Sequence, residues 1–261
     1  NGRPVFIVAR KGAASAGLES FPHRIVDLGD IHTASKALRE AGCRELVFIG
    51  KIGRPRPSEL RFGWRNIRYM PRIMKMIMGG GDAGQLHKLA AFTESIGFQV
   101  VGVTDVAPEL LAPLGILGAC QPVEADRRDL AQGWRIADRL GELDIGQGCV
   151  VVRGRVLAVE AAEGTDAMLE RVAGLGPWDG AGILLKKSSS IQDSRMDLPV
   201  VGPRTVELAI RAGLGGIGLE AGKTIIHDLE TVTGLADRAG LFISGLAGEG
   251  GELSDTAHQQ G

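Results

Sequence analysis

The chain has 261 residues, a formal net charge of −1 at pH 7 and 44% hydrophobic residues. This length suits one large or two modest domains with a substantial core. The ordinary hydrophobic content, with 23% charged residues, excludes disorder over most of the chain. The near-neutral charge predicts no general attraction to nucleic acid.

The three cysteines, Cys43, Cys120 and Cys149, are widely spaced and form no C-x-x-C pair. This spacing argues against a disulfide framework or a structural zinc site and favours a reducing compartment. No run of residues approaches the ~18 apolar residues of a membrane span. We therefore expect a soluble, cytoplasmic protein without a leader peptide.

Strand-like and helix-like segments alternate in the first part of the chain. Strands are predicted at 5–10, 24–28, 45–49 and 98–104, and helices at 31–41 and 82–96. Gly42 and Gly97 stand where glycines end helices, and Asp82 stands where a carboxylate would cap one. The alternation predicts a Rossmann-like parallel sheet with covering helices.

The glycine-containing loops of this region give a weak nucleotide-binding signal. The loop at 11–17 lacks G-x-G-x-x-G spacing and precedes no clear helix, so a nicotinamide cofactor is not indicated. The glycines at 79–81 could hold an anion at a helix N-terminus. A flexible turn capped by Asp82 is the favoured interpretation, because the carboxylate would occupy the same N–H groups.

The segment 51–75 holds eight basic residues against one acid, Glu59. Its basic residues at 61, 65, 68, 72 and 75 share one helical face, although Gly63 and Pro71 interrupt the helix. Such a face suits an anionic membrane surface or an acylated anionic substrate. An ordinary solvated face remains an equal alternative, and RNA binding is ranked below the membrane interpretation.

Proline and glycine punctuate 107–141, which predicts a domain junction bridged by a helix at 125–140. Beyond it, strands at 149–152 and 156–160 form a predicted hairpin, and a helix follows at 166–175. We expect an α/β protein with a Rossmann-like parallel sheet at 1–120, a linker and bridging helix at 121–143, and a mixed α/β domain at 144–261.

Carboxylates and basic residues mix between positions 160 and 230, which suits phosphate chemistry supported by a divalent cation. For any single residue, a solvated surface charge is the more common explanation. If the chain is extended at Asp193, Arg195 and Asp197, their side chains share one side. Asp228 ends a predicted strand at 224–227 and precedes a predicted helix at 229–239, so a ligand site and an N-cap are both open.

Three motifs resemble the UDP-2,3-diacylglucosamine pyrophosphatases of the LpxI type. They are LDIGQGCVVVRGRVLAVEAAEGTDAMLERV, QDSRMDLPVVG and GLGGIGLEAGKTIIHD. The resemblance spans nearly the whole chain, and it implies two domains that hold the acylated sugar between them. It also implies Mg²⁺-dependent hydrolysis to UMP and 2,3-diacylglucosamine 1-phosphate (lipid X) in lipid A biosynthesis of Gram-negative bacteria. The essential aspartate of the family falls on Asp228.

Two positions depart from the family pattern. Members usually begin with a strand and a glycine-rich loop ahead of what is Asn1 here, so we expect the first domain to lack both. The G-D-D found at a helix start in relatives reads Gly81-Asp82-Ala83 in this chain. Because the implied substrate has two acyl chains and lies in a membrane, we expect the basic segment at 51–75 to contact the inner-membrane surface.

We therefore expect a Mg²⁺-dependent hydrolase, peripheral to the inner membrane, with Asp228 as the catalytic residue and a homodimer as its assembly. A nucleotide-sugar transferase and a non-catalytic lipid-binding module remain alternatives. The expected substrate contacts are Lys51, Asp82, Glu163, Thr165, Asp166, Lys187, Gln192, Arg195 and Glu220, and the expected metal ligands are Asp193, Asp197 and Asp228.

Overall fold

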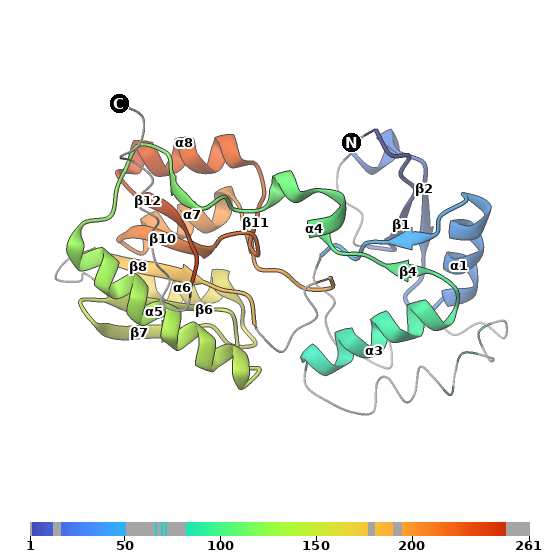
Figure 1. Cartoon of the computed structure of the whole chain (residues 1–261), viewed down its shortest axis with the longest axis horizontal. Helices are drawn as coiled ribbons and strands as arrows, with labels where there is room; N and C mark the ends of the chain where they lie inside the picture. The colour runs from blue at the N-terminus through green and yellow to red at the C-terminus, as the bar shows by residue number, and fades with distance from the viewer. Residues whose placement is uncertain are drawn as a thin grey trace. The chain divides into compact units, whose positions relative to one another are not determined.

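The computed structural model describes residues 2–12, 17–50, 66, 69, 71, 82–176, 181–189 and 195–248, with side chains of the helix at 82–95 described from position 86. The chain divides into two compact units, Asn1–Gly102 and Val103–Gly261, and each is treated by itself (Figure 1). Most of the basic segment at 51–75 lies outside the described residues, so its predicted helical face is not tested.

The first unit contains two parallel strand pairs. Strand β1 (Ile7–Arg10) pairs with β2 (His23–Val26), and β3 (Glu45–Leu46) pairs with β4 (Gln99–Val100). The helices are α1 (Ile31–Glu40) and α3 (Asp82–Ser95), with a short 3-10 turn, η1, at Leu18–Ser20. Among the described residues the two pairs form separate sheets, so the predicted Rossmann-like sheet is not confirmed.

The ends of the helices in this unit follow the sequence expectations. Gly42 and Gly97 have φ values of 75° and 95°, just beyond the ends of α1 and α3. This left-handed conformation costs glycine little, so both residues end their helices as predicted. At the other end of α1, Asp30 accepts a hydrogen bond from the backbone N–H of Thr33 at 3.2 Å, which caps the helix.

A six-stranded mixed sheet forms the centre of the second unit, in the order β5-β12-β10-β8-β6-β7. These strands are β5 (Gly115–Leu117), β6 (Gly148–Val152), β7 (Arg155–Val159), β8 (Gly182–Lys186), β10 (Leu214–Glu220) and β12 (Phe242–Leu246). Strands β8, β10 and β12 are parallel, whereas β6 runs antiparallel to both β7 and β8. The carboxyl ends of β7, β8 and β10 therefore meet at one edge of the sheet.

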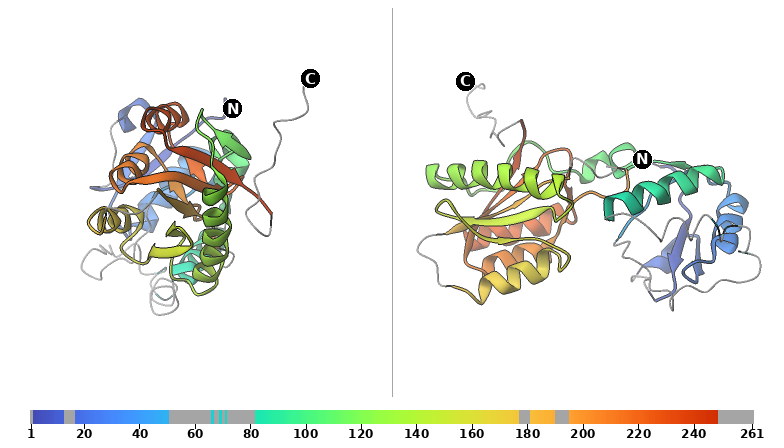
Figure 2. Two further views of the ribbon diagram at one scale, coloured as in Figure 1. Left: turned by 90° about the vertical axis from the view of Figure 1, so that its left-hand side faces the viewer. Right: turned by 90° about the horizontal axis from the view of Figure 1, so that it is seen from below.

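Helices cover both faces of this sheet. Helix α5 (Glu124–Glu142) packs against β6 and β8 on one face. Helices α6 (Thr165–Ala173), α7 (Pro203–Arg211) and α8 (Leu229–Ala239) cover the other face, as Figure 2 shows. A separate pair of parallel strands, β9 (Val200–Val201) and β11 (Ile225–Ile226), lies outside the main sheet. The short helix α4 (Val103–Val106) and the 3-10 turn η4 (Pro108–Leu110) precede β5 in the chain.

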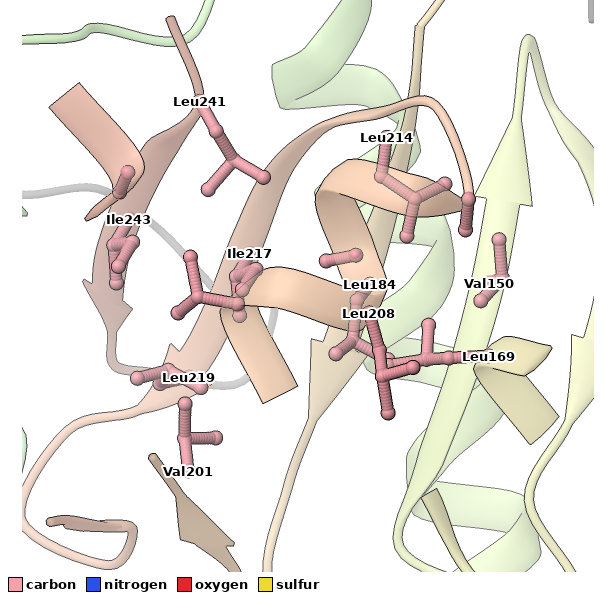
Figure 3. Close-up of a cluster of buried hydrophobic side chains, with 14 of the residues drawn as sticks. Val150, Leu169, Leu184, Val201, Leu208, Leu214, Ile217, Leu219, Leu241 and Ile243 are labelled. Atoms are coloured by element: carbon pink, nitrogen blue, oxygen red, sulfur yellow. The ribbon is translucent and has the colours of Figure 1, made fainter. Parts of the chain in front are cut away.

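Two apolar clusters hold the helices to the sheet. The larger one packs Leu184 of β8 and Ile217 of β10 against the helices α6, α7 and α8, and it includes Leu208 of α7 (Figure 3). The smaller one joins Trp134 of α5 to Leu185 of β8. Burial of these side chains is the main stabilising contribution to this unit. Among the described residues, no helix is both long enough and apolar enough to cross a bilayer.

Candidate active site

Charged side chains gather at the edge of the sheet where β7, β8 and β10 end. Strand β8 ends at Lys186 and β10 ends at Glu220, and Glu160 directly follows β7. In open α/β sheets, ligands bind outside the carboxyl ends of the parallel strands. This edge is therefore the candidate active site of the second unit.

Lys186 and Lys187 point to opposite faces of the sheet at this edge. Successive residues of a strand alternate between faces, and Leu184 lies in the cluster with α6, α7 and α8 whereas Leu185 lies in the cluster with α5. Lys187 accordingly meets α5: its Nζ donates a hydrogen bond to Asp138 and lies 4.9 Å from the centre of the Trp134 ring. Lys186 extends to the α6 side.

Glu220 organises the segment that follows β8. Its Oε2 accepts a hydrogen bond from the backbone N–H of Ser188 at 2.9 Å. Its Oε1 accepts one from Lys223 Nζ at 3.0 Å and lies 3.9 Å from Lys187 Nζ. Because both oxygens have protein partners and the residue is buried, Glu220 acts first as an anchor for the surrounding backbone and lysines.

Lys186 is buried in a polar cluster on the α6 side. Its Nζ donates to Thr165 Oγ1 at the start of α6, and it lies 3.6 Å from Glu160 Oε2. The Thr165 hydroxyl in turn donates to Glu160 Oε1 at 2.9 Å. Burial lowers the pKa of the Lys186 ammonium, and the negative charges of Glu160, Asp166 and Asp197 oppose this lowering.

Asp228 occupies the junction between β11 and α8 that the sequence predicts. Its Oδ1 accepts a hydrogen bond from the backbone N–H of Thr231 at 3.1 Å, so Asp228 is the N-cap of α8. Hydrogen bonds from the side chain and the backbone of Thr231 lower the pKa of the carboxyl group, and the charge of His227 adds to the effect. The residue is exposed and adopts the left-handed conformation with a φ of 60°.

A left-handed residue other than glycine is uncommon, and such residues are concentrated at functional sites. Asparagine and aspartate tolerate this conformation best among the other residues. The backbone of Asp228 therefore holds an ionised carboxylate at the exposed start of a helix. The confirmed N-cap and a role in chemistry are compatible, because the cap engages Oδ1.

The other predicted carboxylates near α6 form exposed ion pairs. Arg171 donates to Glu163 at 3.0 Å, and Arg204 donates to Asp166 at 2.6 Å. Hydrogen bonds from the local backbone and from Arg171 lower the pKa of Glu163. Exposed pairs of this kind contribute little to stability, so a ligand could replace the arginine partner.

The stretch around Arg195 differs from the extended conformation considered for it. Arg195 and Met196 lie in a turn, so period-two alternation does not place Arg195 beside Asp197. Asp197 follows the turn and accepts a hydrogen bond from Gln147 Nε2 at 3.3 Å. Predicted site residues that lie outside the described residues, or whose side chains do, are Lys51, Asp82, Gln192 and Asp193.

No group of three or more histidine, cysteine, aspartate or glutamate side chains suited to a metal occurs among the described residues. The expected ligand set includes Asp193, which falls outside them, so the complete set is not tested. The two members that are described, Asp197 and Asp228, offer carboxylate oxygens, the donor type that Mg²⁺ prefers. Their chemistry fits the expected ion.

The expected substrate contacts and metal ligands include neither Lys186 nor Glu160, although both lie in the stretch of mixed charges between 160 and 230. They include Lys187, whose neighbour in the chain is the more deeply buried lysine: the side chain of Lys186 is 5% exposed and that of Lys187 is 12% exposed. The available signal was the buried run at 182–186, because a lysine that ends such a run stands at the ligand edge of a sheet.

Two family models match the chain. The LpxI N-terminal domain matches residues 1–110, and the LpxI C-terminal domain matches residues 113–244. A protein of Caulobacter vibrioides named UDP-2,3-diacylglucosamine pyrophosphatase LpxI is 39% identical over 251 residues, which cover 94% of this chain and 89% of that protein. These findings confirm the resemblance seen in the sequence motifs.

Proposed function

The chain belongs to the LpxI family, and from this membership we propose that it hydrolyses the pyrophosphate bond of UDP-2,3-diacylglucosamine in lipid A biosynthesis. The products would be UMP and 2,3-diacylglucosamine 1-phosphate. The observation that carries the proposal is the similarity to the Caulobacter enzyme, which extends over nearly the full length of both proteins.

The reaction adds one water molecule across a phosphoric anhydride. The water oxygen forms a bond to one phosphorus, the P–O bond of the bridging oxygen breaks, and the water proton is released. Both phosphates are anionic, so the site needs positive charge near the oxygens that gain charge. Lys187 and Lys223, which share the carboxylate of Glu220, are the candidate phosphate contacts of the described edge.

We assign the catalytic role to Asp228. Its carboxylate is exposed and its lowered pKa keeps it ionised, so it can bind a cation or orient a water molecule. A fixed backbone conformation at the start of α8 restricts where this carboxylate can reach. Pre-organisation of this kind is what catalysis by positioning requires.

We also propose that the reaction depends on Mg²⁺, with Asp193, Asp197 and Asp228 as its ligands. When bound, the ion would neutralise charge on the phosphates. The support is the donor chemistry of these carboxylates together with the resemblance. Glu163, Thr165 and Asp166 are kept as candidate contacts to the sugar, and Arg195 is kept as a candidate contact to the phosphates.

The first unit, in this proposal, is a Rossmann-like parallel domain. Two parallel pairs and their flanking helices support this interpretation. Contact with the inner-membrane surface follows from a substrate with two acyl chains. The homodimer stays a prediction.

A direct assay tests the proposal. Purified protein is incubated with UDP-2,3-diacylglucosamine in MgCl₂ or in EDTA, and the products are identified by mass spectrometry. We expect UMP and the diacylated sugar phosphate in MgCl₂ and a large loss of rate in EDTA. Reaction in ¹⁸O-labelled water then identifies the phosphorus that is attacked. Absence of turnover with magnesium present would overturn the proposed function.

A further inference from the structure

Glu160 and Lys186 lie on either side of strand β6, and the residue of β6 between them is Gly148, which has no side chain. Gly148 is the register partner of Lys186 in the β6-β8 pair, and its carbonyl accepts the backbone N–H of Glu160 at 2.8 Å. The three residues therefore lie in one row across β7, β6 and β8. A Cβ at Gly148 would lie 2.7 Å from Glu160 Oε2, so the glycine makes room for the two charged side chains to approach.

The charges of Lys186 and Glu160 determine which group donates and which accepts in each hydrogen bond of this cluster. An ammonium group only donates and an ionised carboxylate only accepts. Thr165 Oγ1 therefore accepts from Lys186 Nζ and gives its single proton to Glu160 Oε1. The hydroxyl has one acceptor site left. It can meet a hydrogen-bond donor of a ligand, such as a hydroxyl or amide group, and it has no proton left for a phosphate oxygen.

Thr165 is also the first residue of α6, and no side chain caps this helix at Gly164. The polar cluster thus ties the first turn of α6 to the carboxyl end of β8. Asp166, the next residue, is one of the candidate site residues on this turn. Glu160 Oε2 has no hydrogen-bond partner among the described residues, and the nearby ammonium of Lys186 is its compensating charge.

We infer that Lys186 is a positioning residue of this edge: with Glu160, it fixes the hydroxyl of Thr165 and the first turn of α6 in the orientation that a substrate meets. Lys186 acts through these neighbours and contacts no substrate atom itself. The expected effect of Lys186 on the reaction rate rests on the proposed function. Its expected effect on the first turn of α6 rests on the geometry alone.

Two variants separate this role from simple loss of structure. Lys186→Met combined with Glu160→Gln removes both charges together, because removal of one partner alone would leave the other charge buried and unpaired. Gly148→Ala keeps every charge and displaces the Glu160 carboxylate from its place beside Lys186. Ile217→Ala is the matched control, since it removes buried apolar volume from β10 in the same sheet.

We expect kcat to fall about 10- to 100-fold in the double variant and in Gly148→Ala, with KM changed less than about threefold, as for a misplaced reacting group. Hydrogen exchange at the amides of 168–170, the first amides of α6 that have an acceptor within the helix, should accelerate in both. The control should lose stability and keep kcat. Thr165→Ser should retain most of the rate, because it keeps the hydroxyl, and Thr165→Val should resemble the double variant.

A kcat within twofold of wild type together with unchanged exchange in α6 would overturn the inference. If the double variant does not fold, Gly148→Ala decides on the same criteria. Wild-type protein without turnover would instead overturn the proposed function. Exchange at 168–170 would then still decide whether Lys186 holds the helix: acceleration in the variants supports the inference, and no change overturns it.

Discussion

The carboxylate of Asp228 accepts a hydrogen bond from the backbone N–H of Thr231 at 3.1 Å, so the residue assigned to catalysis also caps α8. Substitution of Asp228 therefore affects two properties at once. An alanine variant would lose the cap and the carboxylate together and would also be strained at a φ of 60°. Loss of activity in that variant alone would not separate chemistry from folding.

Asp228→Asn separates the two properties. Asparagine caps helices about as well as aspartate and tolerates the left-handed conformation. We expect this variant to unfold at nearly the temperature of the wild type and to lose about 10²-fold or more in kcat, because its amide carries no negative charge to bind a cation or orient water. Asp228→Gly, which suits the backbone, should likewise be folded and inactive. Thermal unfolding followed by circular dichroism measures the unfolding temperature, and initial rates measure kcat.

An asparagine variant that keeps half of the wild-type rate at saturating substrate and magnesium would contradict the catalytic assignment. A melting temperature that falls as far in Asp228→Asn as in Asp228→Ala would contradict the cap argument. The two outcomes are independent, since the first depends on the charge of the side chain and the second on its hydrogen bond to Thr231.

Glu220 should prove important for stability as well as for substrate. Its Oε2 satisfies the backbone N–H of Ser188, and its Oε1 holds Lys223. We expect Glu220→Ala to lower the free energy of unfolding by about 1–3 kcal/mol, the typical cost of leaving a buried donor unsatisfied. Glu220→Gln keeps acceptor geometry and should lose less. Urea unfolding followed by fluorescence checks both; equal stability of all three proteins would indicate a ligand contact without a structural role.

The hairpin of β6 and β7 and the helices α5 and α8 were predictable from the sequence because local patterns specify them. Strands β8, β10 and β12 were not assigned. Their runs lack polar alternation, since helices cover both faces. Glycines at 216 and 218 also read as turns, yet they lie within β10. A Cβ at Gly216 would lie 2.0 Å from the Phe242 ring, so this glycine serves close packing.

The candidate site was predictable in part for a related reason. The place of Asp228 between a strand and a helix was predicted from local patterns, and the structure confirms that junction. Its catalytic role was implied by the family resemblance and not by its position. Lys186 contacts α6 and Lys187 contacts α5. This difference depends on which helix covers each face of the sheet, and the spacing of residues in the sequence does not predict that. The pairing of Glu160 with Lys186 joins residues from two strands separated by β6.

Cys149 should be unreactive in the native protein. It is fully buried, and this burial raises the pKa of its thiol to about 12, so almost no reactive thiolate exists near neutral pH. Cys43 and Cys120 are partly exposed. We expect iodoacetamide to modify these two in native protein and to reach Cys149 only after unfolding in urea, as mass spectrometry would show. Modification of Cys149 as fast as Cys120 would contradict the packing of β6.

The lowered pKa of Lys186 predicts how stability changes with pH. In the unfolded chain the ammonium titrates near its usual value of about 10.4, and in the folded protein burial lowers this pKa. Between the two pKa values the unfolded chain binds more protons, so the free energy of unfolding rises with pH in that window.

We therefore expect wild-type protein to gain stability, relative to the Lys186→Met and Glu160→Gln double variant, as the pH rises toward the usual lysine pKa of about 10.4. The comparison cancels groups that titrate equally in both proteins, and urea unfolding at several pH values measures it. If wild type instead lost stability relative to the variant over this range, the ion pair with Glu160 would outweigh burial. The pKa of Lys186 would then be raised, and the ammonium would be held more firmly than its burial indicates.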